Sequence, residues 1–123
     1  MAEYLPLHAP GQAITRQASA TITAGQLVIV TGSGTVGPGS AATHLWVGVA
    51  ANDAINGDNV TIFAGGVQRI AATGTVTAGQ LVEAATAGTV ATHTNGTNDF
   101  NVVGLALTTA TVGLLVEVQM DRA

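Results

Sequence analysis

The hydrophobic and polar positions of this chain alternate over short stretches, which is the pattern of β-strands. In the stretch 112–120 one set of side chains is apolar and the other mostly polar: Leu114, Val116, Val118 and Met120 against Leu115, Glu117 and Gln119. A period of two places successive side chains on opposite faces of a strand. Apolar side chains do not recur at helical spacing over the length of a helix anywhere in the sequence. The pattern therefore predicts an all-β fold.

Other short runs rich in Val, Ile and Thr also predict strands, because these residues favour a pleated and half-buried backbone. The expected strands are 21–23, 27–30, 46–50, 60–63, 67–71, 75–77, 81–84, 102–107 and 114–120. Segments rich in Gly, Asn, Asp and Pro separate them, and such residues favour turns. The longest turn expected in the first half of the chain runs from Gly32 to Ser40.

An internal duplication divides the chain. The motif T-[IV]-TAGQLV occurs at 21–28 and again 54 residues later at 75–82, and VGVA at 47–50 corresponds to VGLA 56 residues later at 103–106. Two units are too few for a solenoid, which needs at least about three. We therefore expect an extended N-terminal arm, residues 1–10, followed by a single β-domain, residues 11–123. This domain is predicted to be a small β-barrel or sandwich in which two related halves, 11–64 and 65–120, close on one another.

The composition excludes several classes of partner. The net charge is −4, and the chain has no lysine and only three arginines, which lie far apart at Arg16, Arg69 and Arg122. Binding to nucleic acid or to an anionic membrane requires clustered basic side chains. The longest charge-free apolar stretches are interrupted by Gly and Thr and are shorter than the ~20 residues of a membrane-spanning helix. We therefore expect a soluble protein that has no nucleic-acid partner and no membrane partner.

One glycine motif imitates a nucleotide-binding loop. An apolar run from Leu27 leads into G-x-G-x-x-G at Gly32, Gly34 and Gly37. In a dinucleotide-binding unit, these glycines let a pyrophosphate approach the start of a following helix. Here Pro38 follows at once and would interrupt such a helix in its first turn. The motif therefore indicates a flexible loop between strands, and no cofactor is expected.

The sequence contains no recognisable catalytic set. The chain lacks cysteine, and the histidines, expected at the surface or in loops, lack metal-ligand spacing: His8, His44 and His93. Asp53, Asp58 and Asp99 stand beside turns, where Asp accepts backbone hydrogen bonds, and Glu83 and Glu117 are expected on solvent-facing sides of strands. No metal and no catalytic residue is predicted. A hydrolase that uses Asp53 or Asp58 remains a minor alternative.

Two features indicate binding instead. The arm carries large apolar side chains in a segment broken by Pro6 and Pro10, and the prolines keep the segment extended. Such an arm can bury itself on a neighbour or fold back on its own domain. We expect six of its residues to form the contact: Glu3, Tyr4, Leu5, Pro6, Leu7 and His8. Trp46, the only tryptophan, is a candidate for a subunit interface, with a place in the core as the alternative.

Several motifs, taken in order, match one family of phage proteins. They are MAEYLP (1–6), PG (10–11), ASA (18–20), TAGQLV (23–28), VGVA (47–50), GDNVTI (57–62), GGVQR (65–69) and LVEVQ (115–119). With these motifs the chain resembles the small head decoration proteins, or capsid cement proteins, of tailed bacteriophages, particularly those of actinobacteria. The stretch 47–67 also resembles the decoration protein of lambdoid phages, a β-rich protein that stands as trimers on the shell.

The resemblance implies a virion structural protein and no enzyme. Such proteins are made in the host cytoplasm and bind the outer surface of the expanded head, often as trimers at threefold or quasi-threefold positions, where they brace it against the packed DNA. The implied partners are the major capsid protein of the same phage and other copies of this chain. The N-terminal segment of the family commonly faces the capsid, which agrees with the expected role of the arm. A tail- or fibre-associated module, or a bacterial surface β-domain, is the alternative.

Overall fold

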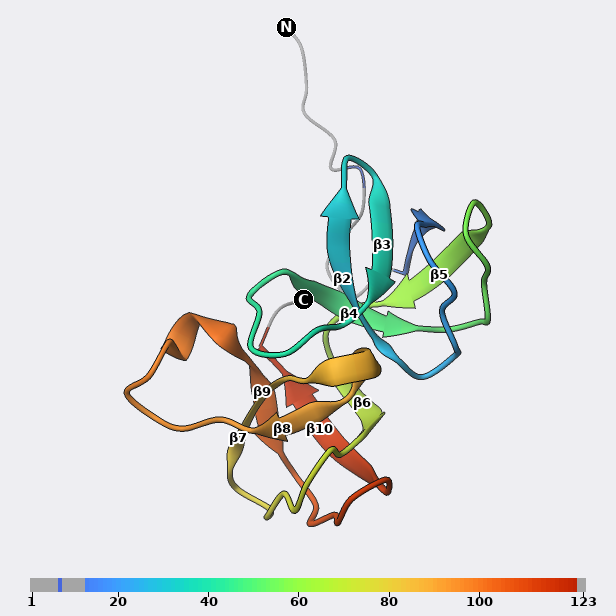
Figure 1. Ribbon diagram of the computed structural model, residues 1–123. Coiled ribbons are helices and arrows are strands. Elements are labelled where there is room, and N and C mark those ends of the chain that lie inside the picture. Colours follow the sequence, from blue (N-terminus) through green and yellow to red (C-terminus); the bar gives the residue numbers. More distant parts are fainter. Residues whose placement is uncertain (1–6, 8–12, 122–123) are drawn as a thin grey trace, which may run out of the picture.

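The computed structural model describes residue 7 and residues 13–121. The regular secondary structure of this part of the chain consists almost entirely of short strands (Figure 1). The strands are β1 Ile14–Ala18, β2 Leu27–Gly32, β3 Thr35–Pro38, β4 Trp46–Ala50, β5 Asn59–Phe63, β6 Val67–Ala71, β7 Leu81–Ala84, β8 Val90–Thr92, β9 Val102–Ala106 and β10 Leu115–Met120. Two 3₁₀ turns, η1 Thr86–Gly88 and η2 Asp99–Asn101, interrupt the second half. The all-β prediction is confirmed.

The first half forms a closed five-stranded barrel in the order β1-β3-β2-β4-β5. The barrel closes because β1 pairs with β5 on one side and, in parallel, with β3 on the other. Its interior holds one apolar cluster: Ala18, Ile22, Val28, Val36, Ala50, Ala54, Val60 and Ile62. Figure 1 shows this barrel, in blue to green, above the strands of the second half.

The second half forms a five-stranded sheet in the order β6-β10-β9-β7-β8. By the repeat, the strands β6, β7, β8, β9 and β10 correspond to β1, β2, β3, β4 and β5. The strand neighbours are then the same in both sheets, except that β6 and β8 form no ladder equivalent to that of β1 and β3. Ala72 and Val90 form an isolated parallel bridge, at the positions equivalent to the Ala18–Val36 pair between β1 and β3. Strand pairing therefore stays within each half of the described chain.

Repeated residues make the same hydrogen bonds in both halves. The Gln26 side chain accepts a hydrogen bond from the Thr23 N–H at 2.8 Å, and Gln80 accepts one from the Thr77 N–H at 2.8 Å. The isolated bridge Ile22–Ala54 likewise has its counterpart in Val76–Ala110. The motif TAGQLV thus encodes a turn that a glutamine side chain closes.

The two halves share a larger core. It contains Leu27, Ile29, Trp46 and Val49 from the first half together with residues of all five strands of the second half. Backbone hydrogen bonds also join the halves, from the Ala42 N–H to the Ala84 oxygen and from the Gly88 N–H to the Gly39 oxygen. The halves therefore meet through this core and these two loop hydrogen bonds, while each forms its own hydrogen-bonded sheet. Among the described residues, no helix is long and apolar enough to cross a membrane.

Some strand predictions were wrong. The stretches 21–23 and 75–77 form only isolated bridges, because the chain turns immediately after them. Strands β1, β3 and β8 were not predicted. β1 has polar side chains at Thr15, Arg16 and Gln17, and its backbone is extended because β3 and β5 pair with it. β3 lies inside the expected long turn, so the glycine motif at 32–37 is a β2–β3 hairpin.

Candidate functional site

The predicted contact arm lies almost entirely outside the described residues. Leu7 is the exception, and this residue is 82% exposed. The remaining members, Glu3 to Pro6 and His8, are not described. Contact through the segment Glu3 to His8 therefore stays a prediction.

Trp46 begins β4 and lies in the shared core. It is 2% exposed in the single chain and belongs to the same cluster as Leu27 and Val103. The indole thus adds apolar contact between the two halves. Its role at a subunit interface stays a prediction.

Polar side chains gather where two loops meet, and we call this region the loop seam. It consists of residues 39–45, between β3 and β4, and residues 93–101, between β8 and β9. The side-chain amide of Asn101 donates a hydrogen bond to the Ala42 oxygen at 3.0 Å, and the rings of His44 and Phe100 meet edge to face at 5.7 Å. The second loop is two residues longer, which accounts for the change in the repeat offset from 54 to 56.

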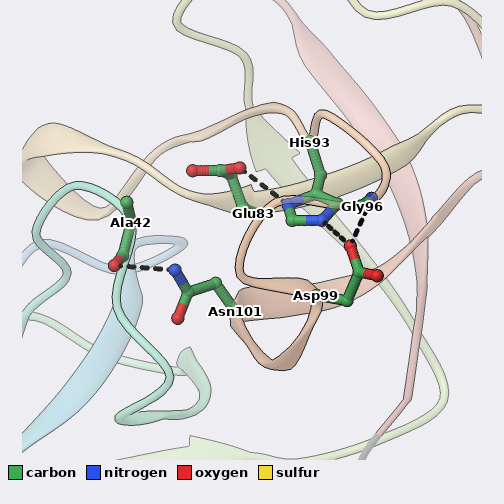
Figure 2. Close-up of polar contacts among 6 residues, drawn as sticks. All are labelled: Ala42, Glu83, His93, Gly96, Asp99 and Asn101. Carbon is green, nitrogen blue, oxygen red and sulfur yellow. Dashed lines mark hydrogen bonds and ion pairs between the residues drawn. The ribbon is translucent and has the colours of Figure 1, made fainter.

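His93, the first residue of the second loop, lies between two carboxylates (Figure 2). Its Nδ1 lies 2.8 Å from a Glu83 carboxylate oxygen, and its Nε2 lies 2.9 Å from an Asp99 carboxylate oxygen. The same Asp99 oxygen accepts a hydrogen bond from the Gly96 N–H at 2.9 Å. The His93 side chain is 1% exposed, whereas that of Asp99 is 66% exposed. The three side chains therefore tie β7 to the loop 93–101.

The geometry favours the charged form of His93. A neutral imidazole has only one N–H, so only the imidazolium donates to both carboxylates. The hydrogen bond to Asp99 raises the pKa of His93 above its usual 6.5, although burial acts against this shift. The same bond lowers the pKa of the Asp99 carboxyl below its usual 3.8. With both nitrogens engaged and its side chain buried, His93 acts as a structural cation between two carboxylates rather than as a catalytic base.

The sequence reasoning missed this arrangement. His93 was expected at the surface or in a loop, and Glu83 on a solvent-facing side. His93 does begin the loop 93–101, but it is buried and Glu83 is bonded to it, because the longer loop folds over β7. The available signal was the two-residue change in the repeat offset, which marks the longer loop in which Asp99 lies. The hydrogen bond from Gly96 does confirm the turn role expected of Asp99.

Replacing His93 tests whether its charged form stabilises the fold. Because the folded-state pKa is raised, proton binding by His93 stabilises the fold below about pH 6.5, and this stabilisation is lost as the pH rises through the higher folded-state pKa. We expect His93→Gln to lower the Tm, with the difference from the unchanged protein largest near pH 6 and narrowing towards pH 8. Thermal unfolding, monitored by circular dichroism, measures the Tm of both proteins at each pH. Asp99→Asn is the control: without the Asp99 carboxylate the pKa of His93 is raised less, so the stabilisation by charged His93 should be lost at a lower pH. A Tm difference between His93→Gln and the unchanged protein that widens as the pH rises would contradict the assignment of His93 as a buried cation.

The carboxylates singled out as hydrolase candidates lie in a shallow groove of about 350 Å³. Asp53 and Asp58 both line it, together with Ile22 and Ile55. The Asp53 carboxylate accepts a hydrogen bond from the Ala24 N–H at 2.8 Å, and in the second half the Thr109 hydroxyl takes the equivalent bond. Since a neutral hydroxyl fulfils this function, Asp53 serves as a turn cap. Among the described residues, no three His, Cys, Asp or Glu side chains are placed to hold a metal ion.

Comparisons with known proteins identify a family for the chain and a solved structure with a similar fold. The family model described as phage cement protein matches residues 8–119, which include both halves. A similar solved structure is that of the N base of the head fiber gp8.5 of bacteriophage phi29, with a TM-score of 0.67 and 21% sequence identity. This likeness, which concerns the fold, covers 91% of this chain and 95% of that one. No curated protein matches the sequence. On the family match, the chain belongs to the phage cement protein family and is a structural protein associated with the phage capsid.

Proposed function

We propose that the protein is a capsid decoration protein that binds the outer surface of the expanded phage head and stabilises it against the pressure of packaged DNA. The observation that carries this proposal is the family match over residues 8–119. The bound form is a trimer at threefold or quasi-threefold positions, and its partners are the major capsid protein of the same phage and other copies of the chain. The protein is made in the host cytoplasm and acts without catalysis.

The physical character of the chain supports this role. It has few charges and no cysteine, so a compact β-domain of this kind offers little to titrate or oxidise. A shell displays the same site many times, and contacts made to several neighbours at once act together, so that individually weak contacts give tight attachment. A protein that binds the expanded shell and not its separated subunits also stabilises the shell by mass action.

Co-sedimentation with phage heads tests the proposal. Heads of the encoding phage, prepared without this protein, are mixed with the purified chain in their expanded and unexpanded forms. We expect saturable binding to expanded heads alone, at a copy number comparable to the number of threefold positions. Absence of binding to both forms, or association with tail fractions instead, would overturn the proposal.

A further inference from the structure

The turn between β9 and β10 carries an exposed apolar surface. Residues Val112, Leu114 and Leu115 are 69%, 59% and 59% exposed, and we call these three residues the apolar turn. No charged residue occurs from Leu107 to Val116. Single exposed apolar side chains are common, whereas several together mark an interaction surface. In Figure 1 this turn lies at the lower end of the molecule, opposite the β2–β3 hairpin.

The duplication shows that the fold does not require these apolar residues. The equivalent turn, between β4 and β5, carries Asn56, Asp58 and Asn59 at the three positions. Both turns have the same backbone: the Gly57 N–H bonds to the Ala18 oxygen at 2.8 Å, and the Gly113 N–H bonds to the Ala72 oxygen at 2.8 Å.

The first residues of the following strands also correspond. Leu115 begins β10 opposite Ala71, just as Asn59 begins β5 opposite Gln17. At these three positions, one copy of the turn thus carries polar side chains and the other apolar ones on the same frame. Apolar side chains at these exposed positions gain free energy only when another surface covers them.

We infer that the apolar turn docks into an uncharged, apolar depression on the outer surface of the phage shell. This inference rests on the proposed function and specifies a contact for it. The size of the surface favours the shell as the occupant: three residues fall far below the ~20–30 on each side of a stable pairwise interface. A patch this small holds a partner when it is one of several linked contacts, which a repeating shell provides and a free second copy does not.

The duplicated turn supplies both the test and its control. The triple variant Val112→Asn, Leu114→Asp and Leu115→Asn gives the second turn the side chains of the first. The reciprocal variant Asn56→Val, Asp58→Leu and Asn59→Leu makes the first turn apolar. We expect the first variant to bind expanded heads at least tenfold more weakly at low occupancy, and the reciprocal variant to bind as the unchanged protein does. Unfolding curves of both variants establish that they are folded.

The outcomes separate this inference from the proposed function. If the unchanged protein binds expanded heads and the first variant binds with the same low-occupancy affinity, the apolar turn is not a shell contact and the inference is wrong. If that variant keeps its low-occupancy affinity and loses only cooperativity as the shell fills, the turn contacts a second copy, and the inference is again wrong. If the unchanged protein does not bind expanded heads, the proposed function is wrong, and the inference that rests on it is wrong as well.

Discussion

Deletion of residues 2–10 is expected to abolish binding to expanded heads while leaving the β-sheet circular dichroism unchanged. The arm lies outside both repeats and holds Tyr4, Leu5 and Leu7 in a segment that also contains Pro6 and Pro10. Burying each leucine in a contact contributes about 1.5–3 kcal/mol. Losing the two leucines alone therefore weakens one contact by roughly 10² to 10⁴-fold, since each 1.4 kcal/mol is about tenfold. Co-sedimentation of the truncated chain with expanded heads measures the loss.

A second variant separates the side chains of the arm from its length. Replacing Tyr4, Leu5 and Leu7 by serine keeps the chain length and both prolines but removes the apolar surface. We expect this variant to lose binding as the deletion does. Normal binding by the deletion would show that Glu3 to His8 do not contact the shell. Loss of binding by the deletion but not by the serine variant would assign the contact to the backbone of the arm.

Gly104→Ala is expected to destabilise the fold severely. A Cβ built on Gly104 would overlap the carbonyl oxygen of Gln119, in the strand that pairs with β9. Neither backbone can move away without disrupting the β9–β10 ladder at the pair Met120–Gly104. We expect the free energy of unfolding to fall by roughly 3 kcal/mol, the upper end of the usual cost of overpacking. That is a large part of the ~5–15 kcal/mol that stabilises a typical domain. Denaturant unfolding measures the change.

The repeat supplies a parallel to this substitution. A Cβ on Gly48, the equivalent residue in the first half, would overlap the Phe63 carbonyl oxygen, so Gly48→Ala is expected to be similarly harmful. Gly74 is the control, because a Cβ there meets no heavy atom within 4 Å and its backbone does not require glycine. Gly74→Ala should leave stability within about 0.5 kcal/mol, as substitutions away from special sites do. Equal stability of the Gly104 and Gly74 variants would contradict the close approach of β9 and β10.

Local patterns predicted strands well where one face of the strand is buried. The alternation in 114–120 anticipated β10, in which Val116, Val118 and Met120 are buried while Glu117 and Gln119 are exposed. β1 lacks such a run, and its extended backbone depends on pairing with β3 and β5. The opposite failure occurred at 21–23, where residues with high strand propensity form only one bridge because the Gln26 side chain closes a turn on Thr23.

The sequence by itself determined the all-β class, the presence of two related halves and the likeness to capsid cement proteins. These follow from alternation, repeated motifs and motif order, which are read along the chain without reference to distant contacts. Only the tertiary structure decided that the first half closes into its own barrel and that the halves share a core. It also decided that His93 is buried between Glu83 and Asp99, and that one of two equivalent turns exposes an apolar surface. These properties depend on which residues distant in sequence meet in space and which are left uncovered, and no local pattern encodes that.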